Sequence, residues 1–185
     1  MKKYKLIALD VEGTVIQDYY PVTTLHPEIV KILKTLPART KLAIVTNQGG
    51  PACHDAGWET SYKYPCFVDV EGRILTIRDA LAAEIGRPVI HYICYAYITN
   101  ENQVILPAAK QHELGVFNWR FWRLPGPGML LQAQDDAGVA DGYDCLYVGD
   151  EDIDHMAAEA LGWDFMWTRN FIVVESNVLG RRASP

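Results

Sequence analysis

Three short apolar runs, each followed directly by polar or acidic residues, constrain the fold of this chain more than any other feature. The runs cover 6–9, 42–45 and 145–148, and the residues after them read DVEGT, TNQ and GDEDID. Each run has the length and composition of a buried strand. Because the carboxyl ends of parallel strands open onto one crevice, the three polar clusters are expected to meet there.

Helix patterns alternate with these runs and complete the prediction of the fold. The expected helices cover 26–36, 77–85, 127–137 and 152–161, and the further expected strands cover 89–97 and 164–168. The run 89–97 is expected to be a central strand. Alternation of strand and helix favours an α/β fold, which we expect to be a three-layer sandwich around a central, mainly parallel sheet.

The length of 185 residues suits one domain. We expect this domain to cover 1–175, with irregular insertions at about 48–73 and 99–126 and a mobile tail over 176–185. Since the first insertion is short, it is expected to form at most a small lid. No large cap domain is therefore expected.

Charge and hydropathy narrow the functional class. The formal net charge of −6 argues against a general nucleic-acid or membrane-surface binder, because such proteins present basic patches. No apolar stretch approaches the length of a membrane span, so we expect no membrane partner and a cytoplasmic location. A phosphorylated substrate is compatible with this charge, because a bound cation offsets nearby carboxylates.

Asp10 and Glu12 are the candidate chemical groups of the first polar cluster. Asp10 ends a predicted strand, where a carboxylate can ligate a cation or attack phosphorus as a nucleophile. Glu12 follows two residues later and can flank the same centre as an acid or a base. The alternative is an ordinary turn at Gly13, and these residues by themselves do not decide between the two interpretations.

The other two clusters favour the chemical interpretation. Asp150 ends another apolar run, and Asp154 follows four residues later on the same face of a predicted helix. We expect Asp150 to ligate a metal and Asp152 to cap the helix, although acids at a helix start also suit the helix dipole. Thr46 and Asn47 can hold phosphate oxygens through a hydroxyl and loop amides, with a plain polar turn as the alternative.

In this order and spacing, the clusters resemble the signatures of the haloacid dehalogenase superfamily. Residues 10–14 are similar to D-x-D-G-T, Thr46 to the strand-ending Thr or Ser, and 149–154 to G-D-x-x-x-D. The strings VTNQGG at 45–50 and PGPGMLL at 125–131 resemble a subgroup with a small cap. That subgroup comprises the histidinol-phosphate, heptose-bisphosphate and polynucleotide 3′-phosphatases.

The resemblance implies a Mg²⁺-dependent phosphomonoester hydrolase that acts through an aspartyl-phosphate intermediate. Asp10 is then the nucleophile. Glu12 is the general acid and base, at a position where the subgroup carries Asp and the enolase-phosphatase branch carries Glu. The implied Mg²⁺ ligands are Asp10, the backbone carbonyl of Glu12 and Asp150, with Asp154 in the outer shell.

The phosphate side of this arrangement departs from the pattern. The resemblance implies that Thr46 and Asn47 bind the phosphate, together with a lysine at the position where this chain has Leu124. Arg123 and Lys110 are the candidates to replace the charge of that lysine. If neither does, the chain is a catalytically impaired relative that binds a phosphorylated ligand or a partner.

Two weaker signals lie in the irregular stretches. Cys53, His54 and Cys66 match no strong zinc spacing and lack a fourth ligand, so free thiols and a surface histidine are preferred. Residues 117–123 interleave aromatic side chains with arginine, which suits either stacking on nucleobases or a half-buried strand or loop edge. Because the chain is acidic, a small phosphorylated substrate is preferred over a nucleic-acid 3′ end, which stays a further alternative.

Overall fold

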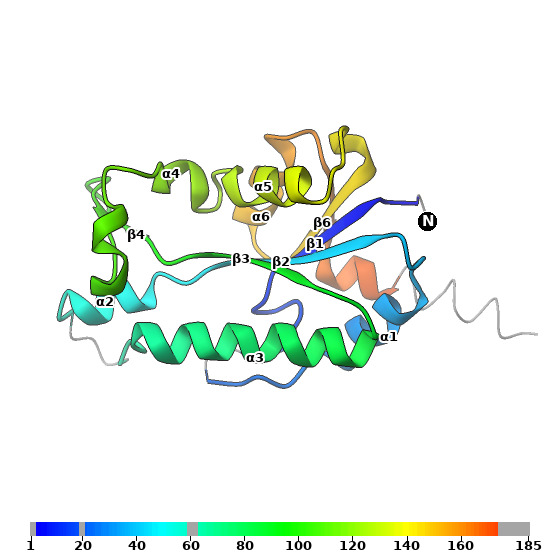
Figure 1. Ribbon diagram of the computed structural model, residues 1–185, viewed down its shortest axis with the longest axis horizontal. Helices are drawn as coiled ribbons and strands as arrows, with labels where there is room; N and C mark the ends of the chain where they lie inside the picture. Colours follow the sequence, from blue (N-terminus) through cyan, green and yellow to red (C-terminus); the bar gives the residue numbers. More distant parts are fainter. Residues whose placement is uncertain (1–2, 19–20, 59–62, 174–185) are drawn as a thin grey trace, which may run out of the picture.

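A five-stranded parallel sheet forms the middle layer of the computed structural model, which describes residues 3–18, 21–58 and 63–173 (Figure 1). The strands run in the order β3-β2-β1-β6-β7, and every neighbouring pair is parallel. Their bounds are β1 Leu6–Leu9, β2 Lys41–Asn47, β3 Ile90–Cys94, β6 Cys145–Gly149 and β7 Asp164–Trp167. The predicted α/β class with a central parallel sheet is confirmed, whereas the expected tail over 176–185 lies outside the described residues.

Helices cover both faces of the sheet and so form the two outer layers. On one face lie α1 (Pro27–Thr35) and α3 (Phe67–Ile85). On the other lie α5 (Gly128–Asp136) and α6 (Asp152–Glu159) (Figure 1). The predicted three-layer sandwich is therefore confirmed.

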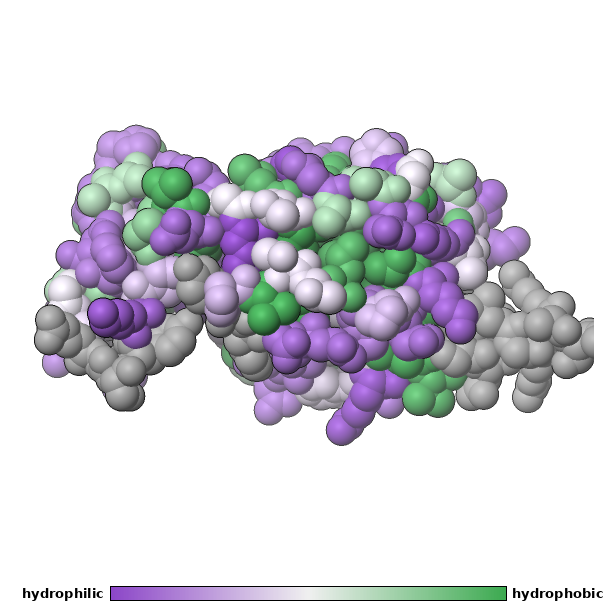
Figure 2. Space-filling model, turned by 90° about the horizontal axis from the view of Figure 1, so that it is seen from below, coloured by the Kyte–Doolittle hydropathy of each residue, from purple (hydrophilic) through white to green (hydrophobic). Residues whose placement is uncertain are grey.

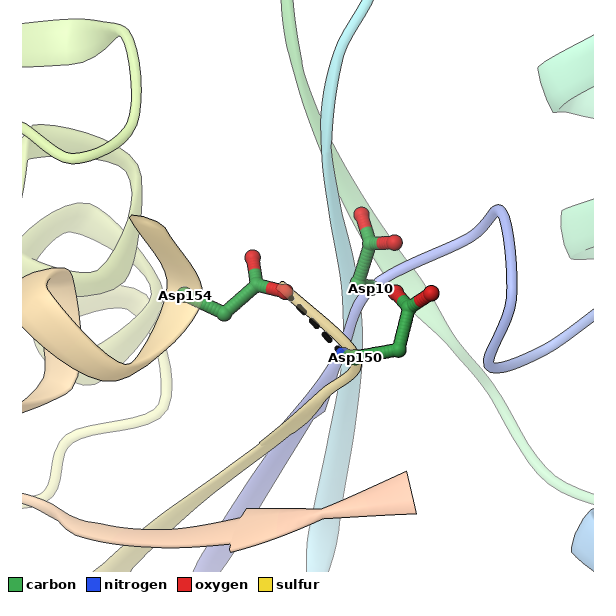
Figure 3. A group of neighbouring side chains, drawn as sticks. All are labelled: Asp10, Asp150 and Asp154. Atoms are coloured by element: carbon green, nitrogen blue, oxygen red, sulfur yellow. Dashed lines mark hydrogen bonds between the residues drawn. The ribbon is translucent and has the colours of Figure 1, made fainter. Parts of the chain in front are cut away.

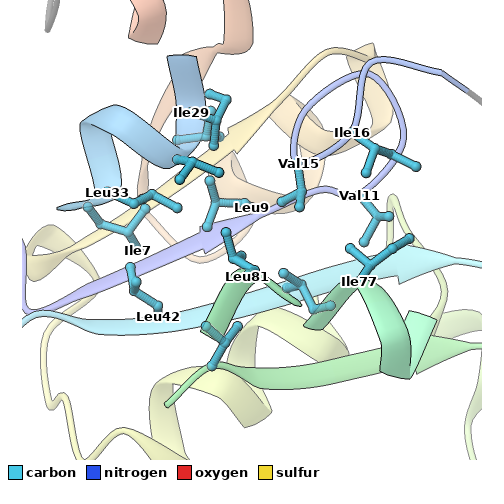
Figure 4. Packing of buried hydrophobic residues seen from close by; sticks show 14 of the residues in the cluster. Ile7, Leu9, Val11, Val15, Ile16, Ile29, Leu33, Leu42, Ile77 and Leu81 are labelled. Carbon is cyan, nitrogen blue, oxygen red and sulfur yellow. The ribbon is translucent and has the colours of Figure 1, made fainter. Parts of the chain in front are cut away.

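The residues of β1 divide the core into two halves, because alternate side chains of a strand point to opposite faces. Ile7 and Leu9 belong to the apolar cluster under α1 and α3, and Leu6 and Ala8 belong to the cluster under α5 and α6. Figure 4 shows the first cluster, in which helix side chains close over β1 and β2. All four β1 residues are buried. Packing on both faces fixes this strand, and thereby the residue that follows it.

α3 begins ten residues earlier than the helix expected at 77–85. Its buried residues recur at helical spacing, and they are Val70, Arg73, Ile74, Ile77 and Leu81. Polar residues in the first turns obscured this stripe in the sequence. The end of the helix agrees with the prediction, because Gly86 adopts a left-handed φ of 70° directly after it.

The run 89–97 is not one central strand, which corrects the expectation. β3 lies at the edge of the sheet, beside β2, and ends at Cys94. Farther along, β4 (Tyr97–Ile98) pairs antiparallel with β5 (Val104–Ile105) in a separate hairpin. Hydropathy did not reveal this, because a strand of a parallel sheet is covered on both faces and reads as an apolar run wherever it stands.

The two predicted insertions extend beyond the carboxyl ends of the strands and contain short helices (Figure 1). The first includes α2 (Gly50–Asp55) and the first turns of α3. The second includes a 3₁₀ helix at Ala108–Glu113 and α4 (Trp119–Trp122). Among the helices of the described ranges, none is long and apolar enough to cross a membrane.

Candidate active site

Residues at the carboxyl ends of β1, β2 and β6 line one cleft at that edge of the sheet. Leu9, the last residue of β1, lies beside Ile44 of β2 and Val148 of β6, and β2 continues three residues farther to Asn47. The cleft has a volume of about 270 Å³. Figure 2 shows the molecule from below, where its outline narrows between the end that carries α2 and the larger part that contains the sheet. The polar lining of the cleft includes Asp10, Glu12, Thr46, Asn47, Asp150 and Asp154.

Three of these carboxylates form a compact group. One oxygen each from Asp10, Asp150 and Asp154 lies within 4.8 Å of the others. Figure 3 shows Asp10 and Asp150 at the ends of neighbouring strands, with Asp154 reaching toward them from α6. Oxygen ligands of this kind are those that Mg²⁺ and Ca²⁺ prefer. Among the described residues this is the one group of three or more His, Cys, Asp or Glu side chains placed to hold a metal ion.

Asp154 is the anchored member of the group. Tyr147 donates its hydroxyl to Oδ1 at 2.9 Å, and the backbone N–H groups of Asp150 and Glu151 donate to Oδ2 at 3.2 and 3.1 Å. The prediction that Asp152 caps α6 is wrong, because Glu151 is the N-cap and forms a capping box with Asp154. Asp154 therefore belongs both to the N-terminal cap of α6 and to the cluster of three carboxylates.

Burial and mutual repulsion disfavour ionisation of these carboxyls. Burial raises the pKa of Asp10 well above its ordinary value, and the charges of Asp154 and Glu12 add to the rise. Burial likewise raises the pKa of Asp150, and it raises the pKa of Asp154 to about 6. A divalent cation would remove this penalty by supplying positive charge between the oxygens. The donor set therefore fits a resident Mg²⁺ ion.

Gly13 allows the first and last clusters to approach each other. Its φ is 72°, in the left-handed region that favours glycine. A Cβ atom at this position would overlap the carboxylate of Asp150. The glycine that follows Glu12 is thus required both by the turn and by the close packing of the acidic group.

Glu12 lines the same cleft and has partners of its own. Its Oε1 accepts a hydrogen bond from Nη1 of Arg73 at 2.5 Å, and its Oε2 accepts one from Gln48 Nε2 at 2.9 Å. Thr46 donates its hydroxyl to the same Oε2 at 3.2 Å. Sequence reasoning missed Arg73, and it placed Gln48 in a polar cluster without giving it a role. A charged residue in the apolar stripe of α3 was the signal that could have revealed Arg73.

The candidate replacements for the absent lysine do not line the cleft. Arg123 donates from Nη1 to the carbonyl of Ala96 at 2.8 Å, and Lys110 pairs with Glu113 at 2.8 Å. Leu124 does line the cleft, yet its side chain packs in the core under α5 and α6.

Asn47 holds the backbone of Leu124 through its side chain. The amide nitrogen of Asn47 donates to the carbonyl of Leu124, and the backbone N–H of Leu124 donates to the amide oxygen, both at 3.1 Å. These two bonds fix the orientation of the Asn47 side chain against the backbone of Leu124.

The weaker sequence signals lie away from this cleft. Cys53 is buried in α2, its neighbour His54 bonds to Asp55 at 2.9 Å, and Cys53 and Cys66 form no disulfide. In the aromatic stretch, the ring of Phe117 packs edge-on against those of Trp119 and Trp122, with centroids about 5 Å apart. This packing agrees with a half-buried edge, but Trp119–Trp122 form the short helix α4 and not the expected strand or loop.

Comparison with solved structures finds a fold of the same kind. A D,D-heptose 1,7-bisphosphate phosphatase from B. bronchiseptica, complexed with magnesium and phosphate, matches with a TM-score of 0.60 and 18% identity over 96% of this chain and 99% of that one. The chain has the fold of the haloacid dehalogenase phosphatases. A protein from Lactobacillus plantarum, provisionally named a phosphoglycolate phosphatase, matches with a TM-score of 0.48 and 15% identity over 92% of this chain and 89% of that one. No protein-family model and no curated protein matches the chain.

Proposed function

We propose that the protein hydrolyses phosphomonoesters with the help of Mg²⁺, through an aspartyl-phosphate formed on Asp10. The observation that carries this proposal is the group of Asp10, Asp150 and Asp154 at the floor of a cleft that also holds Glu12. A carboxylate nucleophile, a second carboxylate for proton transfer and a cation site are the parts that this reaction needs.

In the first step, an oxygen of Asp10 forms a bond to phosphorus and the bond from phosphorus to the leaving oxygen breaks. Glu12 gives a proton to the leaving oxygen. In the second step, Glu12 takes a proton from water, whose oxygen bonds to phosphorus and releases phosphate and free Asp10.

The remaining residues of the cleft bind the cation and the transferring group. Asp10, the backbone carbonyl of Glu12 and Asp150 hold Mg²⁺, and Asp154 acts from the outer shell. When bound, the cation offsets the carboxylate charge and that of the phosphoryl group. The hydroxyl of Thr46 and the backbone of Asn47 bind phosphoryl oxygens.

A small phosphorylated molecule is the preferred substrate. The cleft volume of about 270 Å³ suits one, and the solved structure with the same fold was complexed with magnesium and phosphate. A nucleic-acid end has less support, because the rings of Phe117, Trp119 and Trp122 pack against one another.

A second candidate function is binding of a phosphorylated ligand without efficient turnover. The specific observation that favours it is Leu124, an apolar buried residue where the resemblance calls for a lysine. Lys110 and Arg123 make their contacts outside the cleft, and none of the described residues that line the cleft is a lysine or an arginine.

Hydrolysis of p-nitrophenyl phosphate, with Mg²⁺ and with a chelator, separates the two candidates. We expect Mg²⁺-dependent turnover that Asp10→Asn lowers by about 10⁴-fold or more, because an amide cannot act as the nucleophile. Turnover retained by Asp10→Asn would contradict the mechanism. Absence of turnover from the wild type, together with Mg²⁺ binding measured by calorimetry, would favour the binding function.

A further inference from the structure

Arg73 is a charged residue on the buried side of α3. It stands in the apolar stripe between Val70 and Ile77, and only 4% of its side chain is exposed. Removing a guanidinium from water is costly unless charged or hydrogen-bonding partners compensate for it. The identity of those partners indicates what the residue is there to hold.

The partners of Arg73 come from the segment that follows β1. Nη1 donates to Oε1 of Glu12 at 2.5 Å, and Nε donates to the backbone carbonyl of Val22 at 2.9 Å. The planar guanidinium presents its donors in a fixed fork, so these two bonds also fix the direction from which Glu12 is approached. One side chain of α3 thus ties together the turn after β1 and the chain beyond it.

The other oxygen of Glu12 is held from the side of β2. Oε2 accepts from Gln48 Nε2 at 2.9 Å and from Thr46 Oγ1 at 3.2 Å, and Gln48 also donates to Thr46 Oγ1 at 2.9 Å. The carboxylate therefore has donors on both oxygens, and its rotation is restricted. A free glutamate side chain has many rotamers, so this clamp decides where the carboxylate stands.

We propose that Arg73 is a positioning residue of the active site, which holds Glu12 so that Oε2 faces the cleft for proton transfer. This inference rests on the function proposed above. Glu12, Thr46 and Gln48 line the cleft, whereas Arg73 is not among its lining residues. Arg73 therefore acts through Glu12 and does not touch the substrate.

This arrangement predicts an effect on the chemical step and not on binding. Proton transfer requires the carboxylate within hydrogen-bond reach of the reacting oxygen, and a misplacement of about 1 Å costs on the order of 10²-fold in rate. The two bonds described for Arg73 go to the side chain of Glu12 and to the backbone of Val22, and neither goes to a side chain proposed for Mg²⁺ or phosphate. Loss of Arg73 is therefore expected to lower kcat while KM and the Mg²⁺ requirement change little.

The test compares Arg73→Met with Arg73→Lys, using p-nitrophenyl phosphate and Mg²⁺. We expect Arg73→Met to lower kcat about 100-fold with KM changed by less than about threefold. Arg73→Lys is expected to recover about tenfold of that loss, because an ammonium group can reach Glu12 but lacks the fork that also bonds Val22. Arg78→Met is the matched control, since Arg78 lies on the same helix and bonds to the exposed Asp79 and the half-buried His91.

A double-mutant cycle separates positioning through Glu12 from a general structural role. In a Glu12→Gln background, adding Arg73→Met is expected to lower kcat no further, because Arg73 then has no carboxylate to position. Thermal unfolding of every variant checks that the compared proteins are folded. Should Arg73→Met fail to fold, Arg73→Lys carries the same test.

Each outcome bears on the inference in a defined way. A folded Arg73→Met or Arg73→Lys variant with the kcat of the wild type would overturn it. A rise in KM with unchanged kcat would also overturn it and would assign Arg73 to phosphate binding. Multiplicative effects in the cycle would overturn action through Glu12. If the wild type itself shows no Mg²⁺-dependent turnover, the proposed function fails first and the positioning role falls with it.

Discussion

Four carboxylates of the cleft fall into two sets with different partners: Asp10, Asp150 and Asp154, here called the β1–β6 side, and Glu12, whose partners Thr46 and Arg73 define the β2–α3 side. On the first side, Asp10, Asp150 and Asp154 crowd together, and burial raises the pKa of each. On the second side, Glu12 forms an ion pair with Arg73 of α3. Glu12 therefore has its counter-charge within the protein, whereas the group of Asp10, Asp150 and Asp154 needs a bound cation to offset its negative charge.

Removing a negative charge is therefore expected to have opposite effects on the two sides in the absence of Mg²⁺. At Glu12 the change leaves a buried guanidinium without its anion. At Asp150 it relieves repulsion. The following predictions test this difference, and they run from the largest expected effect to the smallest.

Glu12→Gln is expected to lower the free energy of unfolding by about 3–5 kcal/mol, because it breaks a buried ion pair by removing one partner. Urea unfolding of the metal-free protein measures this change. Glu28→Gln is the control, since Glu28 pairs with Lys31 at 3.8 Å on the surface and such pairs contribute about 0–1 kcal/mol. Equal effects of the two substitutions would show that the Arg73–Glu12 pair adds no special stability.

Asp150→Asn is expected to weaken Mg²⁺ binding about 100-fold, since it removes one of the charged ligands. In a chelator, the same variant is expected to unfold at a higher temperature than the wild type. The sign follows from the raised pKa of Asp150, because the folded state then disfavours the ionised form that Asn removes. Thermal unfolding with and without Mg²⁺ measures both effects.

Asp152→Asn is the control for this pair of measurements, because Asp152 is exposed at the start of α6 and does not belong to the carboxylate group. A variant at Asp150 that is destabilised in the chelator, or that keeps the stabilising effect of Mg²⁺, would refute the contrast between the two sides.

Tyr147→Phe is expected to weaken Mg²⁺ binding about 10-fold, the lower end of the range for residues that orient metal ligands. Its hydroxyl is one of three donors that hold Asp154, so the carboxylate loses part of its orientation. Calorimetric titration with Mg²⁺ measures the change. Tyr92→Phe is the matched control, because Tyr92 donates in the same way to Asp136 on α5, and an equal effect there would rule out a local cause.

The sequence by itself determined the parts of this protein that depend on local pattern. Apolar runs that end in polar clusters identified β1, β2 and β6, and strand direction then predicted that Asp10, Thr46 and Asp150 share one cleft. The end of α3 at Gly86 was predictable for the same reason, since a helix-terminating glycine is a local signal.

Only the tertiary structure decided which distant groups became partners. Distant segments meet where Glu12 pairs with Arg73 and where the side chain of Asn47 bonds to the backbone of Leu124. The position of β3 at the edge of the sheet, beside β2, was likewise decided by the tertiary structure. No periodicity records such contacts, because they depend on how the helices pack on the sheet. A buried charge is stable only when an opposite charge or hydrogen-bonding groups lie next to it. In this protein the packing of α3 on the sheet places Arg73 beside Glu12, in the turn after β1.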